Sequence, residues 1–283
     1  MFLRVFVTSP IAHFHLSTQI STTLRKIMTM FETALSMAQH HGTRCPTGVL
    51  LLDELLGGGY EGGLSHLLYG SPDCTKLLQQ SIATALLHYG PHRSVAVIDA
   101  NNGIRPDTIL NHLRAASVPS PPDSHLQRLN VARAFTTDQL LSLLNEAPDT
   151  IRELHAPILF VNGLMHLLQE EEDMPQPPAP GAPIDPRVFR RGQLASHLKQ
   201  LAFTQQVAVI VSADAPKRAT KPPLRIGQAA RHRFHVLIQH THQDLVETFT
   251  LEKHPSRPWM QRSTVTSHPR HRLSSYQTTL FVE

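Results

Sequence analysis

The sequence predicts an α/β fold in which a mostly parallel central sheet is flanked by helices. Four short, continuous apolar runs have the composition of strands that are buried on both faces, and segments with helical spacing separate them. These runs are 64–69, 94–99, 157–161 and 207–212. Because strands and helices alternate, the runs are expected to pair in parallel. Two later runs, 235–239 and 246–251, are expected to form an antiparallel pair.

Helical spacing of apolar residues marks the segments between the runs. The expected helices are 49–56, 75–89, 108–116, 138–146 and 191–204, and a further short strand is expected at 129–132. Three successive glycines starting at Gly57 end the first helix. Thr136 or Thr137 is a natural N-cap for the fourth helix. Pro72 and Asp73 form the turn between the first apolar run and the second helix.

Composition excludes several classes of protein. The chain has 283 residues and is 41% hydrophobic, which is enough apolar material for a core and argues against wholesale disorder. Two cysteines, Cys45 and Cys74, cannot form a disulfide scaffold, and no Cys/His cluster has zinc-finger spacing, so no metal site is expected. The longest apolar stretch, 156–168, is too short to span a membrane.

Charge is distributed unevenly along the chain. The formal net charge is +4, but residues 215–275 contain eleven basic and three acidic residues and carry +8. This basic segment favours a polyanionic partner, with a solvated basic surface as the alternative.

The ends of the chain differ in composition from its centre. Residues 1–30 contain no Asp or Glu. They are either a mitochondrial-type targeting segment or a disordered or upstream segment. The expected organisation is this end segment, a linker at 31–46, a core at 47–262 and a basic tail at 263–283.

A degenerate phosphate loop follows the first apolar run. A working loop reads Gly, four residues, Gly-Lys and then Ser or Thr, between a strand and a helix. Here the candidate residues for nucleotide binding are Gly70, Ser71, Thr75, Lys76 and Leu77. Thr75 replaces the second glycine, Leu77 replaces the hydroxyl that binds magnesium, and Asp73 adds a negative charge. The alternative is an ordinary strand–helix turn.

Several segments in order resemble the RecA/RadA recombinase superfamily. The helix before the phosphate-loop strand has the superfamily's pattern Thr-Gly-x-x-x-Leu-Asp-x-Leu-Leu-x-Gly-Gly. The matching residues are Thr47, Gly48, Leu52, Asp53, Leu55, Leu56, Gly58 and Gly59. The segments VAVIDANNGIRP, RLNVARAFTTDQLLSLL, APILFVNGLMHLL and RRGQLASHLKQLAFTQQVAVIVS follow the same order. The resemblance covers about residues 45–262 and implies a RecA-like P-loop fold. IDANNG and LEKHPSRP are most similar to the D-type branch of the eukaryotic recombinase paralogues.

The resemblance implies a site that has lost its catalytic groups. Asn101 stands at the position of the general-base glutamate, and Asn162 stands at that of the Walker B aspartate. Neither amide can accept a proton from water at neutral pH. Ala213 replaces a polar residue that senses the γ-phosphate. We therefore expect a pseudo-ATPase without catalytic residues, and we leave open whether ATP and magnesium bind.

Two further contact sites are implied by the resemblance. The superfamily's second DNA-binding loop corresponds to APKRATKPPLRIGQ, with candidate DNA-binding residues Lys217, Arg218, Lys221 and Arg225. Basic side chains there suit contacts to backbone phosphates. Phe31 and Ala34 match a Phe-x-x-Ala element that docks on the neighbouring protomer. The alternatives are an ordinary basic loop and an N-terminal helix that packs on its own face.

Taken together, the resemblance implies an accessory recombinase paralogue of homologous recombination and DNA repair in the nucleus, or in mitochondria if the N-terminus is a targeting segment. Its expected protein partners are other recombinase paralogues or the recombinase itself. It is also expected to bind single-stranded or branched DNA, and no interaction with a membrane is expected. The alternatives are a divergent DNA-dependent ATPase and a RecA-fold regulator outside recombination.

Overall fold

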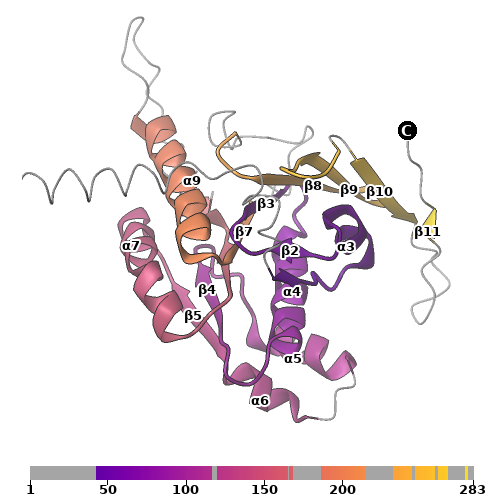
Figure 1. The fold of residues 1–283 in the computed structure, drawn as a ribbon, viewed down its shortest axis with the longest axis horizontal. Helices are drawn as coiled ribbons and strands as arrows, with labels where there is room; N and C mark the ends of the chain where they lie inside the picture. The colour runs from indigo at the N-terminus through magenta and orange to yellow at the C-terminus, as the bar shows by residue number, and fades with distance from the viewer. Residues whose placement is uncertain are drawn as a thin grey trace, which may run out of the picture. The chain divides into compact units, whose positions relative to one another are not determined.

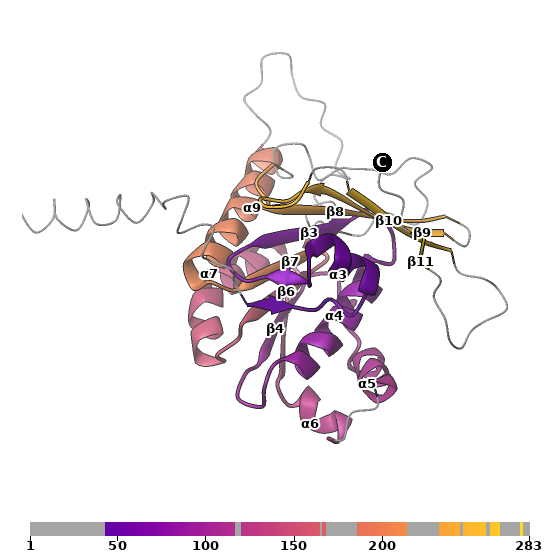
Figure 2. The same ribbon diagram turned by 45° about the vertical axis from the view of Figure 1, so that its right-hand side comes forward.

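Within the residues that the structure describes, a nine-stranded mixed sheet carries helices on both faces (Figures 1 and 2). The computed structural model describes residues 43–116, 120–164, 166–167, 186–213, 232–243, 246–258, 261–266 and 278–279. They lie in the larger of two compact units, residues 42–283.

The sheet combines parallel strands with an antiparallel extension at one side. Its strands are β3 (Ser65–Tyr69), β4 (Val95–Asp99), β5 (Leu129–Arg133), β6 (Ile158–Asn162), β7 (Ala208–Ala213), β8 (Val236–Gln243), β9 (Val246–Lys253), β10 (Gln261–Thr266) and β11 (Thr278–Thr279). They follow the order β11-β10-β9-β8-β3-β7-β6-β4-β5. Neighbours from β8 to β5 are parallel, and β9, β10 and β11 are antiparallel. The expected α/β class, mostly parallel sheet and late antiparallel pair are therefore confirmed.

The antiparallel part is larger than the sequence indicated. The whole of strand β10 pairs with residues 246–251 of β9 and continues to Thr266, beyond residue 262 where the core was expected to end. Its buried side chains are Ser263 and Val265, and they alternate with more accessible ones. One apolar residue in a polar run gives no strand signal, because the period-2 pattern needs several. A two-stranded sheet of β1 (Arg44–Cys45) and β2 (Tyr60–Glu61) was also missed.

Helices lie on the two faces in unequal groups. They are α3 (Leu50–Leu56), α4 (Cys74–His88), α5 (Pro106–Ala115), α6 (Pro122–Leu126), α7 (Thr137–Glu153) and α9 (Pro186–Gln205). One apolar core joins the sheet to α7 and α9, and a second joins its other face to α3, α4 and α5. None of the described helices is both long and apolar enough to cross a membrane.

Helix α7 is longer than expected because it continues through a proline. The sequence predicted that this helix ends at Glu146, before Pro148, whereas in the structure it continues to Glu153. Proline has no N–H, so the carbonyl of Leu144 loses its partner within the helix. His197 of α9 supplies a replacement, because its Nε2 lies 3.0 Å from that carbonyl oxygen. This hydrogen bond links α9 to α7 at the position where α7 lacks a main-chain hydrogen bond.

Residues 47–59, which match the superfamily's pattern, form the segment that precedes β3. The main-chain N–H of Thr47 donates to Asp53 Oδ1 at 2.7 Å, and Ser81 of α4 donates to the Thr47 carbonyl at 2.9 Å. Gly57 ends α3 with φ +70°, a left-handed conformation that favours glycine. The matching residues therefore fix how α3 packs against α4.

Three histidines, His66, His235 and His254, lie near the amino-terminal end of β3, close to several lysine and arginine side chains. Burial lowers the pKa of His66 to about 3, helped by the nearby His254 and His235. Burial also lowers the pKa of His235 and of His254 to about 4, with contributions from neighbouring lysine and arginine side chains. His66 is fully buried, and its Nδ1 has no hydrogen-bond partner among the described residues. These histidines are therefore neutral in the folded protein at neutral pH.

Candidate nucleotide site

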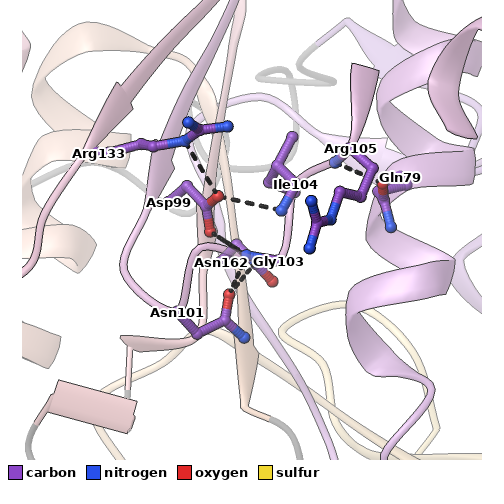
Figure 3. A network of polar contacts seen from close by, with 8 residues as sticks. All are labelled: Gln79, Asp99, Asn101, Gly103, Ile104, Arg105, Arg133 and Asn162. Carbon is purple, nitrogen blue, oxygen red and sulfur yellow. Dashed lines mark hydrogen bonds and ion pairs between the residues drawn. The ribbon is translucent and has the colours of Figure 1, made fainter. Parts of the chain in front are cut away.

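Polar side chains gather at the carboxyl ends of four neighbouring parallel strands. Asp99 ends β4, Asn162 ends β6 and Ser212 lies next to the end of β7. Thr75 stands in the first turn of α4, directly after the turn that follows β3. In open α/β sheets this edge is where ligands bind. Figure 3 shows the central part of the cluster.

The Asn162 side chain is the centre of the cluster. Its Nδ2 donates to Asp99 Oδ1 at 2.9 Å and also to Asn101 Oδ1. Its Oδ1 accepts from Thr75 Oγ1 at 2.9 Å and from Ser212 Oγ at 2.8 Å. An amide has two donor hydrogens and an oxygen with two lone pairs, so every one of these capacities is used. Asp99 only accepts, which fixes the amide nitrogen on its side.

Asp99 shapes the turn from β4 to α5. Its carboxylate is fully buried and accepts the main-chain N–H groups of Gly103 at 3.1 Å and of Ile104 at 3.0 Å. Arg133 Nε, from β5, lies 3.9 Å from Asp99 Oδ2. Together with the Asn162 amide, these groups compensate the buried negative charge (Figure 3). Asp99 is therefore committed to structural contacts.

Asn101 is held between this turn and the end of β6. Its Oδ1 accepts from the Gly103 N–H at 3.0 Å, and its Nδ2 lies 3.4 Å from Thr75 Oγ1. Gly163 packs against it with φ +69°, and a Cβ there would lie 2.5 Å from the Asn101 Cγ. Only glycine fits this approach without displacement. The Gly163 backbone therefore packs closely against one side of this amide.

The turn after β3 uses its own main-chain groups internally. Only four residues, Gly70 to Asp73, separate the end of β3 from the start of α4. Pro72 has no N–H, the Asp73 N–H donates to Ser71 Oγ at 3.1 Å, and the Cys74 N–H donates to the Ser71 carbonyl at 3.3 Å. A phosphate loop instead directs its N–H groups at the ligand. This turn lacks most of that cradle.

Lys76 and Leu77 lie away from the amide cluster. Lys76 lines a pocket of about 450 Å³, together with Asp73, His242 and Glu247. His242 Nδ1 is 3.3 Å from Asp73 Oδ2, so the turn residue is paired with β8. Leu77 is buried in the apolar core between α4 and the sheet. Of the candidate nucleotide-binding residues, Thr75 donates a hydrogen bond to the Asn162 side chain at the end of β6, at 2.9 Å.

A comparison of the sequence with models of known protein families shows which family has this core. A model of the Rad51 family matches residues 42–216, more than half of the chain. The chain belongs to the Rad51 family. It is therefore a member of the RecA/Rad51 recombinase superfamily, with a recombinase-family role in homologous recombination and DNA repair.

Rad51-family membership implies ATP and magnesium, and the residues present do not fit them. Magnesium takes oxygen ligands in near-ideal octahedral geometry. Here Asp99 Oδ1 and Asn101 Oδ1 both accept from the Asn162 Nδ2, whose hydrogens would face a cation. Among the described residues, no group of three or more His, Cys, Asp or Glu side chains could hold a metal ion. The turn after β3 likewise offers few N–H groups for phosphate.

A second pocket lies at the outer edge of the sheet in this Rad51-family core. It has a volume of about 420 Å³ and is formed by β4, β5 and α7. Its lining includes the apolar side chains of Ala96, Ile98, Ala132, Leu143 and Ala147. Strand β5 is last in the strand order, so its outer edge has no neighbour among the described strands.

Several of the predicted contact residues lie outside the described part of this Rad51-family chain. They include the candidate DNA-binding residues Lys217, Arg218, Lys221 and Arg225 and the candidate docking residues Phe31 and Ala34. These assignments remain predictions.

Sequence reasoning missed two members of the site. Ser212 donates to Asn162 and accepts the Gly163 N–H at 3.1 Å, but was assigned only to a core strand. A serine at the end of an otherwise apolar run was the available signal, because parallel strands bring their carboxyl ends together. Gly163 gave no signal, since its close approach to Asn101 depends on the tertiary structure.

Proposed function

We propose that this protein is an accessory paralogue of the recombinase, similar to the D-type branch, that binds DNA and other recombinase-family proteins with little or no ATP hydrolysis. The observation that carries this proposal is the saturated hydrogen-bonding of the Asn162 amide in a chain that belongs to the Rad51 family. Hydrolysis needs a positioned metal and an activated water. Asn101 and Asn162 supply neither a carboxylate ligand nor a base, and their amides are bound to each other. We further propose that the protein acts in the nucleus.

The pocket between β5 and α7 supports the binding of a recombinase-family partner. The resemblance implies a Phe-x-x-Ala element whose aromatic side chain fills an apolar pocket on the neighbouring protomer. The pocket is lined by apolar side chains together with polar ones such as Glu146 and Glu153, and Val131 in its lining is 37% exposed. Aromatic anchors in such pockets contribute much of the binding energy of an interface. A partner's docking element is the proposed occupant.

Affinity purification of the tagged full chain from its source cell tests this function. We expect other recombinase-family proteins to be recovered in stoichiometric amounts, and purified complexes to hydrolyse ATP only through the partner. Recovery of signalling or circadian proteins without any recombinase relative would contradict the proposal. So would ATP turnover by the chain alone.

We propose that DNA binds to the segment that follows β7 in the sequence. Reversing the charges of Lys217, Arg218, Lys221 and Arg225 should weaken binding to single-stranded DNA and lower the slope of log affinity against log salt by about 3, because each lost phosphate contact removes about 0.7. Fluorescence anisotropy over a salt series measures both quantities.

A control for this experiment reverses three exposed arginines elsewhere, Arg93, Arg114 and Arg152. We expect the control to change affinity much less than the loop variant. An unchanged salt slope in the loop variant would show that DNA binds elsewhere or not at all.

A further inference from the structure

The resemblance places Asn162 at the end of the Walker B strand, where the superfamily has an aspartate. The Asn162 Nδ2 group sits between Asp99 Oδ1 and Asn101 Oδ1, two oxygen atoms that would otherwise face one another. The same side chain accepts from Thr75 and Ser212 on its other side. A partially positive NH₂ group that joins two oxygen acceptors makes the same kind of connection as a bound cation.

We propose that the Asn162 amide replaces the divalent cation, so that the ends of β4, β6 and β7 and the start of α4 are held together without metal or nucleotide. This inference deepens the proposed function, because it explains how the core keeps its shape without ATP. It is separable from that function, since its failure would leave the partner and DNA proposals standing.

The chemistry of Asp99 explains why the residue is an amide. Asp99 is a fully buried carboxylate, 2.9 Å from the Asn162 nitrogen. A carboxylate at position 162 would place a second negative charge at hydrogen-bonding distance from the first, in a site that excludes water. Such a pair is stable only if it shares a proton or binds a cation.

The substitution Asn162→Asp would also create a set of oxygen ligands. The introduced carboxylate would join the Asp99 carboxylate, the Asn101 carbonyl and the hydroxyls of Thr75 and Ser212. Hard divalent cations take this kind of oxygen set. The variant is therefore expected to need the metal that the natural chain does without.

Thermal unfolding of the full chain tests the proposal. The melting temperature of the unmodified chain should be the same in EDTA, in millimolar Mg²⁺ and in Mg²⁺ with ATP. Asn162→Asp should lower the melting temperature in EDTA by about 10 °C, because a buried charge loses its compensation. Millimolar Mg²⁺ or Ca²⁺ should recover at least half of that loss.

Asn102→Asp is the matched control. Asn102 lies in the same turn, is exposed and has φ +51°, a conformation that aspartate also tolerates. It adds the same charge outside the network, so we expect little change and no dependence on divalent cations.

Two results would overturn the proposal. One is a rise of several degrees in the melting temperature of the unmodified chain with Mg²⁺ and ATP, and the other is an Asn162→Asp variant as stable as the unmodified chain in EDTA. If Asn162→Asp does not fold, hydrogen exchange of the unmodified chain decides. The N–H groups of Gly103, Ile104 and Gly163 should exchange equally slowly with and without EDTA, and faster exchange on chelation would contradict the proposal.

Discussion

Replacing Ala132 with glutamate is expected to weaken the binding of a recombinase-family partner by about 100-fold or more. Ala132 is half-buried in the lining of the pocket between β5 and α7, and its small side chain leaves the pocket open. Glutamate would fill that space and place a charge where an apolar anchor has to pack. Surface plasmon resonance with the co-purified partner measures the loss.

Asn145→Glu is the matched control, because Asn145 is an exposed residue of α7 that does not line the pocket. It should bind the partner with unchanged affinity. Both variants should melt within a few degrees of the unmodified protein. Equal binding by Ala132→Glu and the control would show that partners use another surface.

Acid is expected to destabilise the protein well before its carboxylates are protonated. In the unfolded chain His66 would titrate near its ordinary pKa of 6.5, whereas in the fold its pKa is about 3. Between these values the unfolded state binds more protons than the folded state. The contribution of His66 to the free energy of unfolding is therefore fully present above pH 6.5 and falls as the pH is lowered toward 3. The loss from His66 is about 1.4 kcal/mol per pH unit. His235 and His254 act in the same direction, but solvent reduces their effects.

Urea unfolding at a series of pH values measures this dependence. His66→Phe should reduce the slope of stability against pH, because it removes the buried group that must charge on unfolding. Phenylalanine also retains an aromatic ring beside Tyr60, whose ring centroid lies 5.3 Å from that of His66. If the substitution leaves the slope unchanged, other groups account for the acid sensitivity.

Most of the fold could be predicted because the buried parallel strands are continuous apolar runs. Strand β7, for example, has six buried residues in succession, a pattern and length typical of a strand that is buried on both faces. The errors occurred where a local rule was overridden by tertiary contacts. Pro148 is a helix breaker in isolation, but the His197 side chain compensates for its missing N–H. The polar strand β10 is stabilised by pairing with β9.

The candidate site could be predicted only in part. Spacing from Gly70 placed Lys76 at the phosphate position, but spacing counts residues and does not reveal where the helix begins. Helix α4 starts at Cys74, so that Thr75 contacts Asn162. Lys76 instead lines the pocket that also contains Asp73, His242 and Glu247. The resemblance predicted that Asn101 and Asn162 stand at the positions of two catalytic groups, and that assignment stays a prediction. Their hydrogen bonds to one another depend on the approach of β4 to β6, which no local pattern shows.

The position of β3 in the sheet has a consequence for synthesis on the ribosome. Its central residue Leu67 pairs with Val211 on one side and with Leu237 on the other, 144 and 170 positions later in the chain. The middle strand therefore has no neighbour until β7 has been translated, and a second neighbour only after β8. Contacts of such high sequence separation form slowly, and an open apolar strand is prone to aggregate in the meantime. Nascent chains that stop before residue 236 should retain an unpaired edge in the middle of the sheet and depend on chaperones.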